Sequence, residues 1–166
     1  MKKKLLFLLT LLISLSAYSS RTYADGMFSV GHKNFSFNVG SGSAYGNRYT
    51  ILGANVNYFV MENLSLGVGY TGWFGDAPKI NKISIPVTYF LPVGETIRPY
   101  IGAVYRHTFI DKPYEDYNAY GGRVGVAISS GGGSFLRIGW VHEYYDAGDG
   151  DDKSEGYPEV SGGYSF

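Results

Sequence analysis

Large apolar or aromatic residues recur at every second position through most of this chain, and this pattern constrains the fold more than any other feature. Glycine, serine, asparagine, threonine or arginine fills most of the positions between them. Successive side chains of a β-strand point to opposite faces, so the period of two predicts strands with one apolar face each. We expect eight strands, whose alternating segments are residues 35–39, 52–58, 64–70, 83–89, 101–105, 120–128, 136–140 and 160–166.

The predicted connections between these strands alternate in length. Three are short, and the other four are longer and mostly polar. Short turns at one end and long loops at the other are typical of an up-and-down barrel that crosses a membrane. The sequence therefore predicts an all-β, eight-stranded antiparallel up-and-down transmembrane β-barrel over residues 25–166. The short links are residues 61–63, 91–96 and 130–134, and the long ones are 41–47, 74–81, 110–117 and 146–157.

Residues 1–24 predict a secretory signal peptide. Three lysines precede an apolar run over residues 5–15, and small and polar residues follow it. Cleavage after Ala24 fits the small-residue rule, and a site at residues 17–19 competes with it. A chain cleaved after Ala24 keeps 10 basic and 14 acidic side chains, a net charge that disfavours nucleic acid as a partner. The absence of cysteine excludes disulfides and thiolate metal sites.

A soluble ligand-carrying barrel would alternate in the same way, so the direction of each face has to be decided. The polar face of such a barrel meets water and is rich in long charged side chains. Here small residues dominate the polar positions, which suits the crowded interior of an eight-stranded barrel. The apolar positions carry almost no charge and predict a lipid-facing band with aromatic residues toward its edges. The expected aromatic girdle is Tyr58, Tyr70, Tyr89, Tyr105, Tyr120, Trp140 and Tyr144.

The signal peptide, the eight alternating segments, the three short turns and the aromatic end of the last segment together resemble the small outer-membrane β-barrel domain of the OmpA/OmpX type. The resemblance implies that Tyr164 and Phe166 form the signal that the barrel-assembly machinery recognises. It places the chain in the cell outer membrane, as a monomer in contact with outer-membrane lipid and lipopolysaccharide. It implies no cofactor, and a role in envelope integrity or in surface interaction through the long loops.

Four charged residues are expected to face the lumen, in the half nearer the long loops: Arg106, Arg123, Glu143 and Glu159. Charges in a narrow lumen must pair, because an unpaired buried charge costs several kcal/mol. We expect a salt-bridged plug that closes the lumen, with a selective small pore as the alternative. Two more arginines, Arg98 and Arg137, lie inward near the short turns, where Glu62 or Glu95 are candidate partners.

An enzymatic barrel is a further alternative, since some lipid-modifying outer-membrane barrels, with deacylase or acyltransferase activity, use a histidine with a serine and an acid. His107 and His142 face outward near the long-loop ends. They lie on the fifth and seventh segments, and no serine stands two residues from either at the lipid-facing positions. We therefore expect no catalytic residues and a non-enzymatic barrel.

The last predicted loop is acidic, with Asp146, Asp149, Asp151 and Asp152. It contains only a fragment of the alternating ligands of a calcium-binding loop and lacks the glutamate that ends one. We expect a solvated loop and no metal site, with weak divalent-cation bridging to lipopolysaccharide as the alternative.

Two prolines interrupt the strand pattern, Pro86 inside the fourth expected strand and Pro99 inside the fifth. A proline cannot donate a hydrogen bond to a β-ladder, and a closed barrel has no edge strand to accommodate it. We expect a bulge or a missing ladder bond near residues 91–96.

Overall fold

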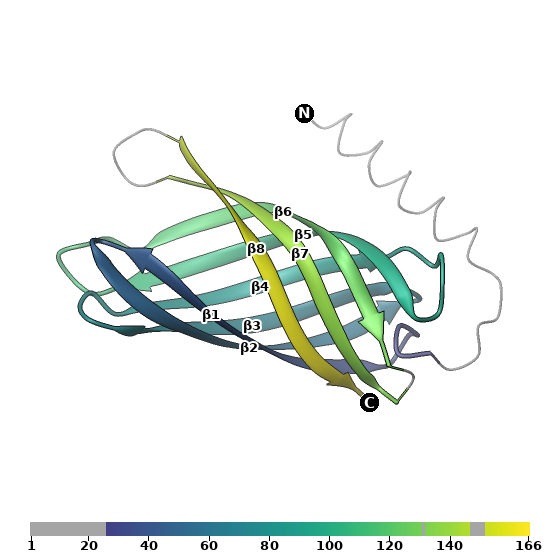
Figure 1. The fold of residues 1–166 in the computed structure, drawn as a ribbon. Helices are drawn as coiled ribbons and strands as arrows, with labels where there is room; N and C mark the ends of the chain where they lie inside the picture. Colours follow the sequence, from purple (N-terminus) through teal and green to yellow (C-terminus); the bar gives the residue numbers. More distant parts are fainter. Residues whose placement is uncertain (1–25, 131, 147–151) are drawn as a thin grey trace, which may run out of the picture.

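The computed structural model describes residues 26–130, 132–146 and 152–166. Within them the chain forms eight antiparallel strands that pair in sequence order and close into a barrel (Figure 1). This confirms the predicted fold class. No helix in the described part of the chain is long and apolar enough to span a bilayer. The strands are β1 (Lys33–Ala44), β2 (Asn47–Met61), β3 (Leu64–Gly75), β4 (Ile80–Phe90), β5 (Ile97–Ile110), β6 (Tyr117–Ser129), β7 (Ser134–Asp146) and β8 (Asp152–Ser165).

The two faces of the barrel wall point in the predicted directions. On β1, Phe37 is exposed and the neighbouring Ser36 is fully buried, and the same alternation continues around the barrel. Tyr89 is the exception in the expected aromatic girdle, because it is buried at the short-turn end of β4. The outward surface is therefore an apolar band, and the lumen is lined mainly by small and polar side chains.

The connections at the expected long-loop end are shorter than the sequence predicted. Only Tyr45 and Gly46 separate β1 from β2, residues 76–79 separate β3 from β4, and residues 111–116 separate β5 from β6. The strands continue into these polar segments because the backbone hydrogen bonds of a β-ladder do not depend on apolar side chains. A bilayer requires only about 9–11 residues per strand, whereas β2 has 15 and β5 has 14. The strands themselves thus project beyond the apolar band.

The ladder is interrupted beside Pro86, as predicted, whereas it runs unbroken past Pro99. The β3–β4 ladder pairs Leu66 with Val87 and resumes at Gly69 with Ser84, so no ladder pair forms opposite Pro86 on that side. Pro99 pairs with Val126 in an unbroken register. It lies at the third position of β5, where a proline is tolerated near the start of a strand.

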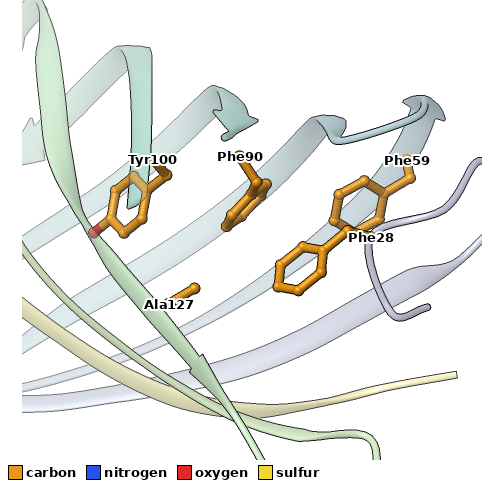
Figure 2. Packing of buried hydrophobic residues seen from close by; sticks show 5 residues of the cluster. All are labelled: Phe28, Phe59, Phe90, Tyr100 and Ala127. Atoms are coloured by element: carbon orange, nitrogen blue, oxygen red, sulfur yellow. The ribbon is translucent and has the colours of Figure 1, made fainter. Parts of the chain in front are cut away.

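A cluster of buried aromatic side chains lies inside the barrel at the short-turn end (Figure 2). The inward rings of Phe59, Phe90 and Tyr100 lie in line across the lumen, and Phe28 from the segment before β1 packs against the first two. The backbone holds that segment in place, since Asn63 N–H donates to the carbonyl of Phe28 at 2.8 Å. Residues 26–32 therefore form a cap, which the sequence pattern did not indicate. We call residues 26–32, together with the inward rings of Phe59, Phe90 and Tyr100, the aromatic cap.

Closure of the barrel is incomplete along the seam between the first and last strands. Residues 34–37 of β1 pair with residues 162–165 of β8, and the register stops there. The remaining residues of both strands pair only with their other neighbours, β2 and β7. The far ends of β1 and β8 lie apart in Figure 1. Within the described residues, the barrel wall is open from Phe37 toward the long-loop end.

Candidate functional site in the barrel lumen

The structure brings the four charged lumen residues together as two ion pairs. Arg106 on β5 donates to Glu143 on β7 at 2.8 Å, and Arg123 on β6 donates to Glu159 on β8. All four side chains are largely buried. Each pair joins strands that are two apart, so each spans the strand between them on the lumen side. Because the pairs interleave, they form a layer of charge on the lumen side of β5 to β8, which we call the charge layer.

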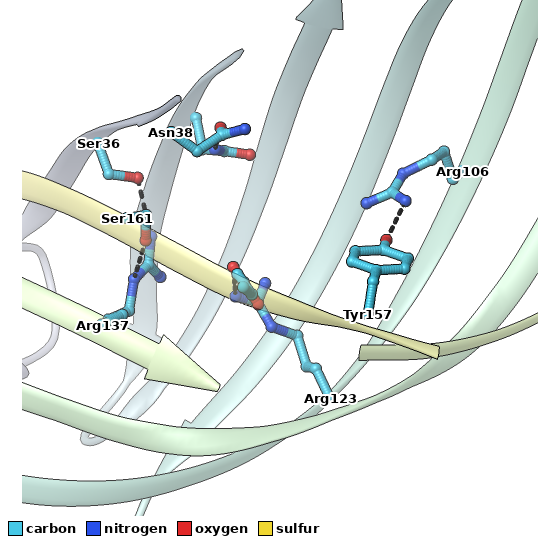
Figure 3. Close-up of polar contacts among 9 residues, drawn as sticks. Ser36, Asn38, Arg106, Arg123, Arg137, Tyr157 and Ser161 are labelled. Carbon is cyan, nitrogen blue, oxygen red and sulfur yellow. Dashed lines mark hydrogen bonds and ion pairs between the residues drawn. The ribbon is translucent and has the colours of Figure 1, made fainter. Parts of the chain in front are cut away.

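Tyr157 extends this layer toward β8. Its hydroxyl accepts a hydrogen bond from Arg106, and the guanidinium lies 5.7 Å from the centre of the Tyr157 ring (Figure 3). Sequence reasoning missed this residue, although its parity with Glu159 on the same strand is the signal that would have found it.

Tyr100 lies between the charge layer and the short-turn end of the barrel. Its ring fits there because the wall that it packs against carries glycine. A Cβ atom added to Gly125 would stand 2.7 Å from the Tyr100 ring and 2.6 Å from the Cα of Gly139. Real Cβ contacts of that length do not occur without movement of the neighbours. Gly125 and Gly139 pair directly between β6 and β7. This pair of glycines makes room for the ring, whose hydroxyl end reaches toward Arg123.

The two arginines nearer the short turns both donate hydrogen bonds to neutral groups. Arg137 donates to Ser36 at 2.8 Å and to Ser161 at 3.3 Å, so that one buried guanidinium joins β7 to both strands of the seam (Figure 3). Arg98 donates to the side chain of Asn63 at 2.5 Å and lies over the ring of Phe28 in the aromatic cap. The expected partner Glu62 accepts instead from the backbone of the cap. Its carboxylate receives the N–H of Val30 at 3.0 Å.

Tyrosines surround the mouth of the lumen at the other end. Tyr45 in the β1–β2 turn packs on Tyr114 in the β5–β6 loop with ring centres 4.1 Å apart, and Tyr117 packs on Tyr145 at 5.0 Å. Burial, and then the neighbouring Tyr114 hydroxyl, raise the pKa of the Tyr45 hydroxyl above its ordinary value. A cavity of about 1030 Å³ lies among these residues. The first and fifth strands are thereby linked across the mouth.

The histidines considered for catalysis are held by other groups. His107 shares a hydrogen bond of 2.6 Å with the side-chain oxygen of Asn118, and its ring packs on Phe109. The ring of His142 packs edge-on against Tyr144. Within the described residues, neither histidine makes a hydrogen bond to a serine or to a carboxylate.

The remaining predicted site residues lie at the ends of strands. Tyr164 and Phe166 face outward, and the backbone of Phe166 exchanges two hydrogen bonds with Lys33 at 2.8 and 2.9 Å. In the acidic loop, Asp149 and Asp151 lie outside the described residues. Asp146 ends β7 and Asp152 begins β8, and their side chains are also outside the description. The signal peptide expected over residues 1–24 is outside it as well.

Comparison with known proteins supports the fold. No protein-family model and no curated protein matches the chain. Among solved structures, the N-terminal β-barrel domain of OprF from Pseudomonas aeruginosa is 15% identical, with a TM-score of 0.54 and coverage of 83% of this chain and 98% of that one. Neisserial surface protein A is 17% identical, with a TM-score of 0.55 and coverage of 81% and 94%.

A third solved structure extends the same likeness. The outer membrane protein OprG from Pseudomonas aeruginosa is 14% identical, with a TM-score of 0.50 and coverage of 86% of this chain and 99% of that one. At such low identities the likeness establishes a shared barrel fold over most of each chain.

Proposed function

We propose that this chain is an integral outer-membrane barrel, exported with cleavage of its signal peptide, that acts without catalysis and does not conduct ions. Support for the membrane comes from the outward band of apolar side chains, which a barrel in water would not expose so widely. Further support comes from the shared fold, since one of the similar structures is named as an outer membrane protein and another as a surface protein.

The observation that supports the proposal is the presence of packed aromatic rings and paired charges inside the lumen. The aromatic cap lies inside the short-turn end, and the two interleaved ion pairs lie on the lumen side of β5 to β8 above it. An eight-stranded barrel has an interior that side chains alone can fill. An ion crossing this lumen would have to displace packed aromatic rings and separate paired charges.

Contact with other molecules at the surface would then involve the projecting strand ends and the tyrosine-lined mouth. Aromatic side chains give large contact areas and retain a polar group, and for that reason they are enriched at interfaces. Tyr45 and Tyr114 are both partly exposed at this end. Envelope integrity or surface interaction is the class of role that such a closed barrel supports.

Conductance in a planar lipid bilayer tests the proposal. The purified barrel should show no steady ion current, and the double variant Phe28→Ala/Phe59→Ala, which empties the cap, should show intermittent current. Phe37→Ala removes the same side chain from the lipid-facing side of β1 and should stay silent. Steady current through the unmodified barrel would favour the small-pore alternative. Altered lipid acylation in cells that express the barrel would favour the enzyme.

A further inference from the structure

A proline in the sequence of β8 explains why backbone pairing along the seam does not continue. Lys33 and Phe166 exchange two backbone hydrogen bonds, so every second pair along the seam should do the same. Continued beyond Phe37 and Gly162, this register would place Ser41 opposite Pro158 as such a pair. Proline has no N–H to donate. Pro158 still pairs with Trp140 on β7, because its missing donor is on the side that faces β1.

The seam opens within the apolar band. Val39 and Val160, the first outward pair beyond the closed part, are 73% and 51% exposed. Backbone N–H and C=O groups left without partners cannot face hydrocarbon, and irregular backbone at membrane depth occurs only where it is buried in protein or lines a water-filled cavity. The edges of β1 and β8 at this level therefore require polar surroundings.

A cavity of about 300 Å³ lies behind the opening. Its lining includes residues 38–43 of β1 and residues 155 and 157–160 of β8, and it reaches Arg106 and Arg123 in the lumen. The seam thus connects the lipid-facing surface with the charge layer. A molecule in this position would meet apolar side chains outside and charged side chains inside.

Arg123 and Glu159 of the charge layer both line this cavity, and the Glu159 side chain is 20% exposed. The Nε of Arg123 and one carboxylate oxygen of Glu159 are buried and have no hydrogen-bond partner among the described residues. Arg123 is 7% exposed. One of these groups is a donor with positive charge and the other an acceptor with negative charge. A ligand with an anionic part and a cationic part complements both charges.

We propose that the seam between β1 and β8 is a binding site for a zwitterionic membrane lipid with a phosphoethanolamine-type headgroup. The phosphate accepts from the guanidinium of Arg123, and the ammonium donates to the carboxylate of Glu159. The polar headgroup lies between the edges of β1 and β8, and the acyl chain passes over the outward side chains of Val39 and Val160 into the bilayer. A β-strand from another protein fits less well, because Pro158 cannot donate to it and because a strand would leave the paired charges unused.

Native mass spectrometry of the barrel in non-ionic micelles tests this proposal. The probe is a lysophospholipid with a phosphoethanolamine headgroup. We expect one bound molecule per barrel, and about tenfold weaker binding of lysophosphatidylglycerol with the same chain or of glycerophosphoethanolamine without one. Equal binding of the anionic lipid would overturn the zwitterionic site. A dimer joined through the β1 and β8 edges would overturn the lipid as occupant.

Different variants test the contribution of the charged residues and that of the open seam. Arg123→Gln/Glu159→Gln should weaken binding of the probe about tenfold. Pro158→Val restores a donor toward Ser41, so it should shorten the distance between spin labels at residues 39 and 160 and release the lipid. Pro99→Val, on a fully paired strand, should change neither. Only folded barrels, selected by heat-modifiable gel migration, are compared.

Each remaining outcome counts against part of the proposal. An unchanged label distance in Pro158→Val would overturn the role of that proline. A shortened distance with undiminished binding would overturn the seam as the site. The inference rests on the proposed membrane location but not on the closed lumen. A barrel that conducts ions and still binds the probe would contradict only the non-conducting function.

Discussion

Arg106 on β5 and Glu143 on β7 form an ion pair of 2.8 Å across the strand that separates them in the barrel wall. Arg123 and Glu159 repeat this relationship one strand further along. Partners on adjacent strands would stabilise only one ladder, whereas these pairs span three strands each. Breaking one should therefore affect both the charge balance of the lumen and the packing of the wall.

The partner assignment can be tested by double-mutant cycles on Arg106 and Glu143. Each single change, Arg106→Met or Glu143→Gln, leaves one buried charge unpaired and should cost about 3–5 kcal/mol of unfolding free energy. The double variant should recover much of that loss. Urea unfolding in lipid vesicles measures these free energies. A cycle on Arg123 and Glu143, which are not paired, should give a smaller coupling, and equal couplings would contradict two discrete pairs.

The lipid-facing assignment predicts a depth-dependent cost of arginine. Val68→Arg, in the exposed apolar part of β3, should lower the unfolding free energy by about 2–4 kcal/mol. Val93 is also exposed but lies in the β4–β5 turn, so Val93→Arg should cost about 0–1 kcal/mol. Equilibrium unfolding in the same vesicles compares the two. Similar costs at both positions would mean that the β3 surface does not face hydrocarbon.

The close approach of Tyr100 to the wall predicts different effects for two neighbouring regions of β6. Gly125→Ala places a methyl group against the Tyr100 ring and should destabilise the barrel by about 1–3 kcal/mol. Gly122→Ala should be nearly neutral, because the nearest atom to its added Cβ is 3.9 Å away. Midpoints of thermal or urea unfolding report the difference. An equally stable Gly125→Ala barrel would show that Tyr100 does not lie over this glycine.

The C-terminal residue has a backbone role and a proposed signalling role, which two variants can separate. Deleting Phe166 removes the ladder pair with Lys33 together with the aromatic ring, whereas Phe166→Ala keeps the backbone and loses only the ring. If the ring is the assembly signal, both variants should leave processed, unfolded chain in the periplasm. Phe166→Tyr should assemble normally. Heat-modifiable migration of the cell fractions on a gel measures the folded barrel.

Normal assembly of Phe166→Ala together with failure of the deletion would assign the effect to the ladder pair alone. Refolding of the purified variants into vesicles without cellular factors provides the comparison. There, Phe166→Ala should fold nearly as well as the unmodified chain.

Much of this protein follows from local pattern. Whether a strand residue faces lipid or lumen depends only on its parity, so the faces of β1 through β8 were predictable. The same parity placed Arg106, Arg123, Glu143 and Glu159 inside the barrel. Tyr157 was available to the same reasoning and was overlooked. Strand ends were harder to predict, because polar residues such as Ser41 and Ser43 continue the backbone ladder without an apolar pattern.

Only the tertiary structure decided which groups meet. Pairing of Arg106 with Glu143 depends on the register of β5, β6 and β7 together, and parity cannot supply that register. The insertion of Phe28 into the lumen depends on a short segment with no period of its own. The four-residue closure of β1 with β8 joins the two ends of the chain, and it depends on how the whole sheet curves. Local alternation determines the direction of each side chain, whereas long-range closure determines its neighbours.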